Sequence, residues 1–312
     1  ADDGTVRAII ERERLDSHRL IEEFMITANV AAAETLEKQR QPCMYRIHDR
    51  PSKEKADALN QFLYSLDLQF AKGQVPQPRL FNQILSSVVG EPEAHMVNQM
   101  ILRSQAQAEY SPNNISHFGL ALRRYAHFTS PIRRYADLLV HRALVSGLKL
   151  GAGGLDNHGE DFEDLAGHIS ATERRAAKAE RDAVDRFTAL YLTDQIGAEF
   201  AARVNGVSRA GLFVTLKETG ADGLVPIRTL PNDYYDHDPI LHTLTGTSHG
   251  IVFSLGQELE VRLEEAIPLT GGLIMTLVGG EKTAMPNRPE RGKNHVSGRR
   301  RGPKRRRGRR RS

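Results

Sequence analysis

Apolar residues recur at three- to four-residue spacing through most of the first 195 positions, which is the period of an amphipathic helix. The pattern is longest between residues 15 and 40, where Leu20, Phe24 and Ala28 share one face. Shorter stretches with the same period are residues 52–66, 80–89, 94–104 and 135–150. We therefore predict that residues 1–195 form a helix-rich domain.

The last helix of this domain has a candidate start signal. Residues 151–164 are rich in Gly and Asp and are expected to form a polar loop. The run Ser170-Ala171-Thr172-Glu173 matches a capping box, in which a hydroxyl and a carboxylate satisfy free backbone donors at a helix start. We predict a helix that begins at Ser170 and ends near Asp194.

From Gly197 onward the apolar period changes from that of a helix to the alternation of strands. Gly and Ser turns separate the alternating segments at 200–204, 211–216, 224–227, 251–253, 259–263 and 273–277. Five or six short strands in about 80 residues indicate a small closed barrel. The predicted fold is therefore α+β and multidomain, with a helix-rich domain at 1–195 followed by an all-β OB-type barrel at 196–280.

Composition narrows the class of protein. The 312 residues are 39% hydrophobic and 26% charged, which is typical of a water-soluble globular protein. The single cysteine, Cys43, excludes an intrachain disulfide and a cysteine-based zinc cluster and suits a reducing compartment. No segment reaches the roughly 18 apolar residues of a membrane span, and the first residues lack the pattern of a secretion signal. We expect a cytoplasmic protein without a membrane partner.

The net charge of +4 conceals an asymmetry. Residues 281–312 contain eleven Arg and three Lys against two Glu, a net +12, so residues 1–280 carry −8. Blocks of like charge repel one another and seldom fold alone. We predict a disordered basic tail over 281–312 that binds a polyanion, with Arg305 and Arg306 in its densest part.

The segment 125–142 gathers arginines and aromatic residues around a Thr-Ser-Pro turn. Arginine forks on phosphates and aromatic rings under bases are the usual means of holding single-stranded nucleic acid. The candidates for RNA contact in this segment are Tyr125, Phe128, Arg134, Tyr135, His141 and Arg142. An ordinary helix whose arginines pair with surface carboxylates explains the same composition.

Three motifs in this part of the chain resemble those of the ribonuclease II and ribonuclease R family. They are RLIEEFMITANVAAAE at 19–34, SHFGLALRRYAHF at 116–128 and HFTSPIRRYADLLVHR at 127–142. The later run VNGVSRAGLFVTLKETGADGLVPIRTL resembles the S-one type OB fold that follows the catalytic domain in that family. The resemblance covers about residues 1–280, and the basic tail is of the kind that ends many ribonuclease R proteins.

The resemblance implies an activity and a set of residues. The family degrades RNA from its 3′ end by hydrolysis with Mg²⁺ and releases nucleoside monophosphates. By position, Arg133 would contact the scissile phosphate, Glu22 would bind near the terminal nucleotide, and Glu180 would lie near the product path. Glu23 replaces Glu22 if the helix faces the other way. Without the resemblance, Glu180 is an ordinary surface charge between basic neighbours.

The barrel departs from its type in its aromatic residues. Phe200 and Phe213 fit the stacking positions of an RNA-binding OB fold, and Arg228 is a basic candidate beside them. Ala210 stands where an aromatic residue often precedes the GLF motif, and Pro226 stands in place of the more usual histidine. Phe213 can equally be a core residue. We expect this barrel to bind RNA more weakly than its type, with the basic tail compensating.

The departure in the first domain is larger. The family holds Mg²⁺ through clustered aspartates in the first half of its catalytic domain, and the sequence contains no such cluster. We expect the C-terminal portion of a longer ribonuclease whose partners are single-stranded RNA 3′ ends, structured RNA and the missing half of the domain, and not DNA. The isolated chain is expected to cleave RNA weakly or not at all. The alternatives are a non-catalytic RNA-binding protein, one piece of a split enzyme, or a docking module.

Overall fold

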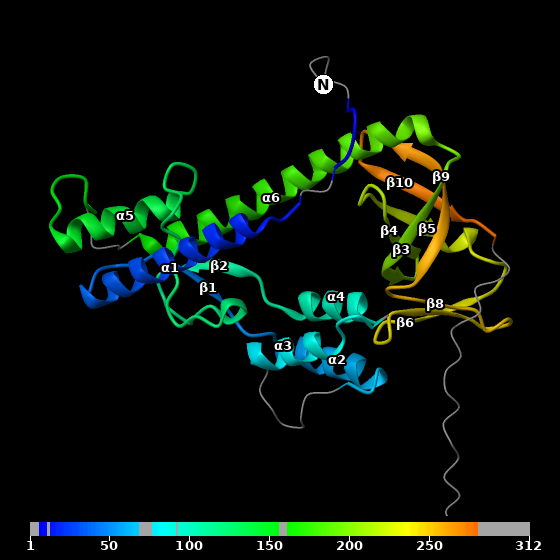
Figure 1. The fold of residues 1–312 in the computed structure, drawn as a ribbon, viewed down its shortest axis with the longest axis horizontal. Coiled ribbons are helices and arrows are strands. Elements are labelled where there is room, and N and C mark those ends of the chain that lie inside the picture. The colour runs from blue at the N-terminus through cyan, green and yellow to red at the C-terminus, as the bar shows by residue number, and fades with distance from the viewer. Residues whose placement is uncertain (1–5, 11–12, 69–76, 92, 156–160, 280–312) are drawn as a thin grey trace, which may run out of the picture.

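The computed structural model describes residues 6–10, 13–68, 77–91, 93–155 and 161–279. Three bodies make up the molecule (Figure 1): a helical body around α1, α5 and α6, a smaller body of α2, α3 and α4, and a β-barrel. Helix α6 runs from the first body to the barrel, and the smaller body lies along the opposite side of the molecule. Both halves of the predicted architecture, helix-rich and then a barrel, are confirmed.

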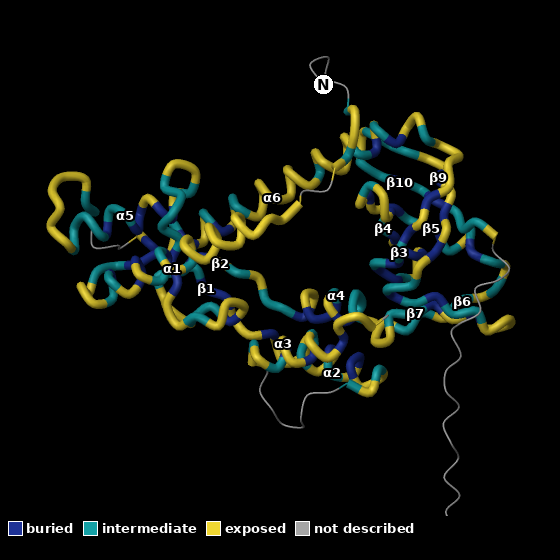
Figure 2. Tube along the Cα trace, in the orientation of Figure 1, coloured by how far each residue is buried: buried dark blue, intermediate teal, exposed yellow. Residues whose placement is uncertain are grey.

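The helical body packs around a two-stranded antiparallel ladder. Its elements are α1 (Asp16–Lys38), β1 (Tyr45–His48), β2 (Ala108–Ser111) and α5 (Tyr135–Leu148). Helix α1 buries only its second half, where Ala33 and Leu36 are fully buried against Met44 and Val140. Its first half exposes Leu20, Ile21 and Phe24, each more than half exposed. The long predicted helix is confirmed, but its apolar face is only partly covered by the described chain (Figure 2).

Helix α6 (Phe162–Leu192) begins eight residues, about two turns, before the predicted start at Ser170. Ser170 is not a cap but lies inside the helix, 3% exposed, where its Oγ accepts a hydrogen bond from the backbone N–H of Tyr110 at 3.0 Å. The capping-box prediction was wrong because this hydroxyl satisfies a strand, not a helix end. Residues 174–187 are exposed apart from the partly buried Asp182 and connect the helical body to the barrel.

The smaller body consists of α2 (Lys53–Ser65), α3 (Pro78–Ser87) and α4 (Ala94–Ser104). Ser52 caps α2 by accepting a hydrogen bond from Lys55 N, and the core centres on Phe62, Leu63 and Val97. Leu255, which precedes the last long hairpin of the barrel, is 2% exposed and belongs to this core. The smaller body therefore holds the barrel at a second place besides α6.

Five strands close the barrel in the order β10-β5-β4-β3-β9. They are β3 (Glu199–Ser208), β4 (Gly211–Leu216), β5 (Asp222–Pro226), β9 (Glu258–Ile267) and β10 (Gly272–Leu277). Inward residues of alternate positions, such as Val204, Val214, Val225 and Val261, are fully buried. The predicted OB-type barrel is confirmed.

A second sheet between β5 and β9 was not predicted in full. It contains β6 (Tyr235–Asp238), β7 (Thr243–Gly246) and β8 (Val252–Ser254), of which the sequence indicated β8 alone. Its far turn is built on Asp233, whose carboxylate accepts hydrogen bonds from the backbone N–H groups of Tyr234, Ser248 and His249. Backbone hydrogen bonds to a short polar turn leave no apolar pattern in the sequence.

No helix in the described ranges combines the length and the apolar character that crossing a bilayer requires.

Candidate nucleic-acid interface

A groove of about 200 Å³ lies between α1 and the loop that precedes α5. Helix α1 contributes Glu22, Met25, Ile26 and Asn29. The loop and its approach contribute Leu120, Tyr125, His127, Thr129, Ser130, Arg133 and Arg134. Segments about 100 residues apart in the sequence therefore meet at one site, and both carry motifs singled out from the sequence.

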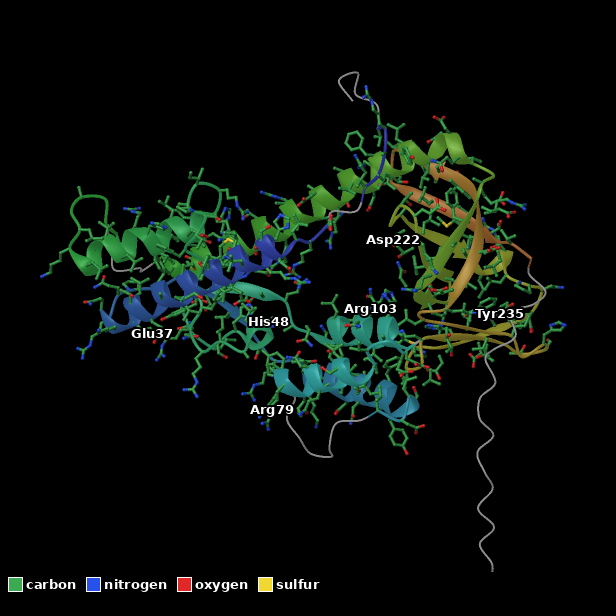
Figure 3. The ribbon with its side chains drawn as sticks, viewed as in Figure 1. Glu37, His48, Arg79, Arg103, Asp222 and Tyr235 are labelled. Carbon is green, nitrogen blue, oxygen red and sulfur yellow. The ribbon has the colours of Figure 1, made fainter. Side chains whose placement is uncertain are left out.

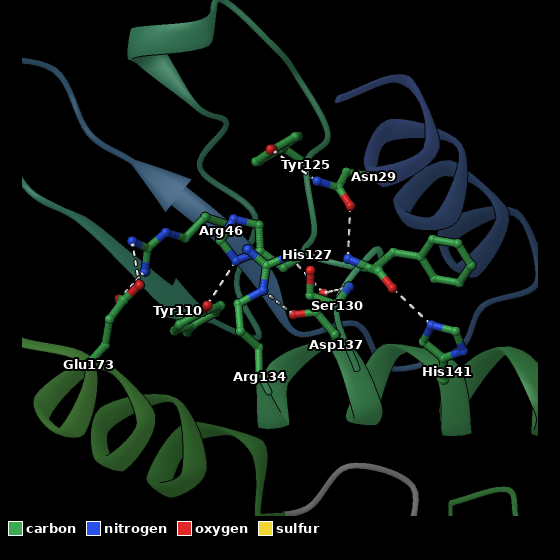
Figure 4. Close-up of polar contacts among 11 residues, drawn as sticks. Asn29, Arg46, Tyr110, Tyr125, His127, Ser130, Arg134, Asp137, His141 and Glu173 are labelled. Carbon is green, nitrogen blue, oxygen red and sulfur yellow. Dashed lines mark hydrogen bonds and ion pairs between the residues drawn. The ribbon is translucent and has the colours of Figure 1, made fainter. Parts of the chain in front are cut away.

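Asn29 fastens the loop to α1. The residue is 3% exposed in the middle of the helix, where an unpaired amide would be costly. Its Oδ1 accepts a hydrogen bond from Phe128 N at 2.8 Å, and its Nδ2 donates to the Tyr125 hydroxyl at 3.1 Å (Figure 4). The amide thus satisfies its own donor and acceptor while it fixes two points of the loop.

Asp137, in the first turn of α5, fastens the same loop from the other side. Its side chain is fully buried, and its Oδ1 accepts hydrogen bonds from Ser130 N and from Nη2 of Arg134, both at 2.8 Å. Its Oδ2 accepts from Nε of Arg134 at 2.8 Å, so the ion pair is a two-pronged one. Arg134 is consequently engaged within the protein.

The other RNA-contact candidates of 125–142, apart from Tyr135, also have structural partners among the described residues. His141 Nε2 lies 2.8 Å from the carbonyl oxygen of Phe128, and the two rings stack with centroids 4.3 Å apart. Arg142 donates two hydrogen bonds to the carbonyl oxygen of Gly154. Tyr125 is 8% exposed, so its ring face is covered, whereas Tyr135 is 49% exposed at the start of α5. These contacts hold the loop in place. The sequence alone does not show whether such residues serve the fold or bind RNA.

Arg133 differs from its neighbours. It is exposed at the groove, and the described residues provide no hydrogen bond or ion pair to its guanidinium. Ile132 beside it is fully exposed. Across the groove, Glu22 lines the wall and forms an ion pair with Arg14, whereas Glu23 is exposed and is not among the lining residues. The groove therefore presents one open guanidinium facing a helix that carries a carboxylate.

Behind the groove lies a network that sequence reasoning missed. Arg46 of β1 pairs with Glu173 of α6 through two hydrogen bonds of 2.6 and 3.1 Å, and its guanidinium carbon lies 4.6 Å from the ring centroid of Tyr110. The Tyr110 hydroxyl is 2.8 Å from His127 Nδ1. The sequence pattern assigned Glu173 to a helix cap and therefore did not predict its ion pair with Arg46. Glu180, the candidate from this helix, is exposed two turns further along α6.

Two imidazoles near the groove are held uncharged. Burial lowers the pKa of His127 to about 3, and the guanidinium groups of Arg134 and Arg46 act in the same direction. Burial, followed by the ring of His48, lowers the pKa of His117 to about 4. Both rings are therefore neutral at physiological pH, and the open positive charge at the groove is that of Arg133.

The described residues do not fit a magnesium site. Mg²⁺ prefers near-octahedral oxygen ligands, of which carboxylates are the usual protein source. Within the ranges that the structure describes, no group of three His, Cys, Asp or Glu side chains is placed to hold a metal ion. Glu22 is the acidic member of the groove lining and is already paired with Arg14. No metal-dependent step is therefore assigned to these residues.

The barrel carries an outward apolar row on three neighbouring strands. Phe213 of β4 is paired with Leu224 of β5, which is paired in turn with Ile274 of β10. Phe213 is 44% exposed and lies opposite Gly206, where an added Cβ would come within 3.3 Å of the Phe213 Cβ. Arg228 is exposed just after β5. Phe213 is thus a surface residue of the barrel, available for stacking.

Phe200 corrects the prediction for the same surface. It is 6% exposed and belongs to the barrel core together with Ala202 and Val204, while Ala201 between them faces outward. Strand alternation puts Phe200 on the inner face, so it is not a stacking platform in this structure. The predictions for Arg305 and Arg306 lie outside the described residues.

These features define the class of protein: a helical domain with an arginine-bearing groove, joined to an OB-type barrel. Residues 1–149 match the model of the RNB domain, and residues 193–277 match that of the S1 RNA binding domain. The chain belongs to the RNB family.

Two similar proteins are named ribonuclease R. The chain is 42% identical over 268 residues to ribonuclease R of Escherichia coli K12, a match covering 83% of this chain and 33% of the relative. It is also 42% identical over 259 residues to ribonuclease R of Aquifex aeolicus, covering 83% of this chain and 37% of that relative. The chain thus spans about a third of the length of the curated relatives that it matches.

Solved structures agree with the sequence matches. The apo form of Mycoplasma genitalium RNase R superposes with a TM-score of 0.79 at 31% identity, covering 86% of this chain and 42% of that one. The same protein in complex with ribose methylated single-stranded RNA gives a TM-score of 0.80 at 30% identity, covering 87% of this chain and 43% of that one.

Proposed function

We propose that this chain is the RNA-holding portion of a processive 3′-to-5′ exoribonuclease of the ribonuclease R type, which hydrolyses RNA to nucleoside 5′-monophosphates in the cytoplasm. The observation that carries the proposal is the open guanidinium of Arg133 in a groove whose every other charged side chain, among the described residues, already has a partner. The relatives named ribonuclease R support the reaction class.

Arg133 contacts the scissile phosphate in this proposal. A guanidinium carried on a backbone that is fixed by the turn stabilises negative charge that develops on phosphate oxygens. Glu22 lies on the opposite wall, where its carboxylate accepts hydrogen bonds from the terminal ribose once Arg14 releases it. Glu180 remains a proposed contact for the departing product on the exposed stretch of α6.

Mg²⁺ is supplied with its ligands by a further part of an RNB catalytic domain that covers the open faces of α1 and α6. Leu20, Ile21 and Phe24 on α1 and Val184 and Phe187 on α6 are each more than half exposed. Contiguous exposed apolar residues on helices of a folded domain mark surfaces that another element covers. The length of the relatives, about three times the matched span, leaves room for such a part.

The barrel and the tail add affinity for RNA. Phe213 stacks on a base, and Arg228 and the tail arginines neutralise phosphates. Because residues 1–280 carry −8, the general attraction to a polyanion comes from the tail, while the groove selects the single-stranded 3′ end. This arrangement favours RNA over DNA only through the groove and barrel, since phosphate contacts do not discriminate.

The test uses a fluorescent single-stranded oligouridylate with the chain and with Arg133→Ala, in Mg²⁺ buffer. We expect the chain to bind and to leave the RNA intact or nearly so, and Arg133→Ala to bind roughly 10- to 100-fold more weakly, the size of a lost charge-assisted contact. Arg79→Ala is the matched control, because Arg79 is exposed on α3 of the smaller body (Figure 3) and is not among the residues that line the groove.

Each outcome has a meaning. Equal binding by Arg133→Ala and Arg79→Ala would overturn the proposed groove. Stepwise shortening of the RNA that Arg133→Ala abolishes would show that this chain needs no further part for catalysis. A second candidate function, an RNA-binding module that never cleaves, is favoured by the lack of a metal-ligand group among the described residues. It predicts no cleavage even after a ribonuclease R fragment carrying the aspartate cluster is added.

A further inference from the structure

We infer that Asp137 is a positioning residue that selects Arg133, and not Arg134, as the phosphate-binding arginine of the groove. The inference rests on the proposed function, because it concerns how the same groove presents its charge. Two adjacent arginines follow Pro131-Ile132, and both line the groove. A phosphate offered two free guanidinium groups one residue apart can be held in two registers, whereas hydrolysis at a fixed point needs one.

The geometry of the turn supports this role. The backbone N–H groups of Arg133 and Arg134 both donate to the carbonyl oxygen of Ser130, at 3.3 and 3.0 Å, so the turn is closed by its own backbone. Asp137 then holds both ends of that turn, Ser130 through its backbone N–H and Arg134 through its guanidinium. Arg133 lies between the two held residues, with its backbone fixed and its side chain exposed.

Charge supports the same role. The Asp137 side chain has no exposed surface, and two of its three hydrogen bonds come from Arg134, so the pair is neutral within the protein. Arg134 is 23% exposed and cannot offer its Nε to a ligand while this pair persists. Asp137 therefore removes one of two adjacent positive charges from competition for the phosphate.

Asn29 provides an independent anchor for the same loop. It lies seven residues after Glu22 on α1, so both residues lie on nearly the same face of the helix. By holding Phe128 N and the Tyr125 hydroxyl, it sets the separation between the wall that bears Glu22 and the loop that bears Arg133. Asn29 can be tested without altering any buried charge.

The experiment is a double-mutant cycle on affinity for the oligouridylate, measured on the full chain. In the wild-type background, Arg133→Ala is expected to weaken binding roughly 10- to 100-fold. In the Asp137→Asn background, where Arg134 is free to bind phosphate, we expect Arg133→Ala to weaken binding less than about threefold. Adding Arg134→Gln to Asp137→Asn removes the competing charge and is expected to restore the full effect of Arg133→Ala. A purely structural role of Asp137 predicts no such rescue.

Stability is followed in parallel by thermal unfolding, since breaking a buried ion pair is destabilising. If Asp137→Asn does not fold, Asn29→Ala replaces it in the cycle. In that background we expect Arg133→Ala to change the logarithm of RNA affinity by no more than half as much as it does in the wild type. Ser104→Ala is the matched control, because it removes a buried hydroxyl in α4 outside the groove, and should leave the Arg133 effect intact.

Two failures are distinguishable. If the wild-type chain binds RNA without dependence on Arg133, the proposed function fails. If Arg133→Ala costs the same factor in the wild-type, Asp137→Asn and Asn29→Ala backgrounds, the proposed function stands and the positioning role is overturned.

Discussion

At the scale of single residues, the groove depends on polar groups that are buried and satisfied. A row of rings runs from His48 through His117, Tyr125 and His127 to Tyr110, with successive centroids 5.1 to 5.7 Å apart. His48 keeps one ring nitrogen on the carbonyl oxygen of Ala106 and the other on Gly119 N. Burial disfavours a positive charge on two rings of this row, His127 and His117, and lowers the pKa of each.

Stability is therefore expected to fall as the solution is acidified. The folded pKa values of His127 and His117, about 3 and about 4, lie below the ordinary 6.5, so the unfolded chain binds more protons between these limits. The contribution of these two uncharged imidazoles to the free energy of unfolding is fully present above about pH 6.5 and decreases as the pH falls toward 4. From pH 7 to pH 5 we expect a loss of about 1–3 kcal/mol, or several degrees of melting temperature.

Thermal unfolding followed by circular dichroism at pH 7, 6 and 5 measures this loss. His127→Gln keeps a polar side chain of similar reach without the titration and should show a smaller difference between pH 7 and pH 5. His249→Gln is the control, because His249 is 65% exposed and lies on the far turn of the second sheet. An equal pH response in wild type and His127→Gln would contradict the assignment.

At the scale of elements, two neighbouring strands place one phenylalanine in the barrel core and another on the barrel surface. Phe200 and Phe213 have the same chemistry and lie on adjacent strands of one barrel. The strand pleat sends the first into the core, 6% exposed, and the second to the surface, 44% exposed. Gly206 permits this arrangement by leaving room beside the Phe213 ring.

Substitution should separate the two tasks. Phe213→Ala is expected to weaken RNA binding by about 1–3 kcal/mol, roughly 5- to 150-fold, with little change in melting temperature. Phe200→Ala is expected to destabilise the barrel by about 3–5 kcal/mol, because it leaves a cavity in a closed core. Fluorescence anisotropy and thermal unfolding of both variants measure the two effects. Unchanged RNA affinity in a folded Phe213→Ala protein would remove this surface from the interface.

At the scale of the whole molecule, two attachments fix the barrel relative to the groove. One is α6, and the other is the smaller helical body, where Arg103 donates to the carbonyl oxygen of Asn205 and the rings of Phe62 and His242 lie 6.4 Å apart. Gly256, at φ +81°, also lies close to Met96 of α4, because a Cβ added at Gly256 would lie 3.2 Å from the Met96 Cβ. A strand of RNA that touches Phe213 and Arg133 thus spans two surfaces that are held in one orientation.

The charge of the whole chain is unevenly distributed, and we therefore expect RNA binding to depend on salt. Removing residues 281–312 takes away +12 and leaves a chain of net −8. We expect the shortened chain to bind RNA more weakly, with the slope of log affinity against log salt reduced by about 0.7 for each phosphate that the tail neutralises. A chain whose tail keeps its length but has Ser in place of Arg and Lys is the control. An unchanged slope in either variant would exclude the tail from binding.

The sequence by itself determined the order of the domains, the long first helix and the loop that carries Arg133. Apolar periods of 3.6 and 2 arise from local geometry, so they are readable wherever one face of an element is buried. The resemblance to family motifs assigned Glu22 and Arg133 to one site, although these residues are far apart in the sequence.

Tertiary structure alone decided which polar residues serve the fold and which face a ligand. Arg133 and Arg134 are chemically identical neighbours, and what separates them is the buried carboxylate of Asp137. Ser170 fitted a helix cap in the sequence, but its hydroxyl meets a strand 60 residues away. The physical reason is the same in both cases: a buried polar group must find a partner, and that partner is a neighbour in space, not along the chain.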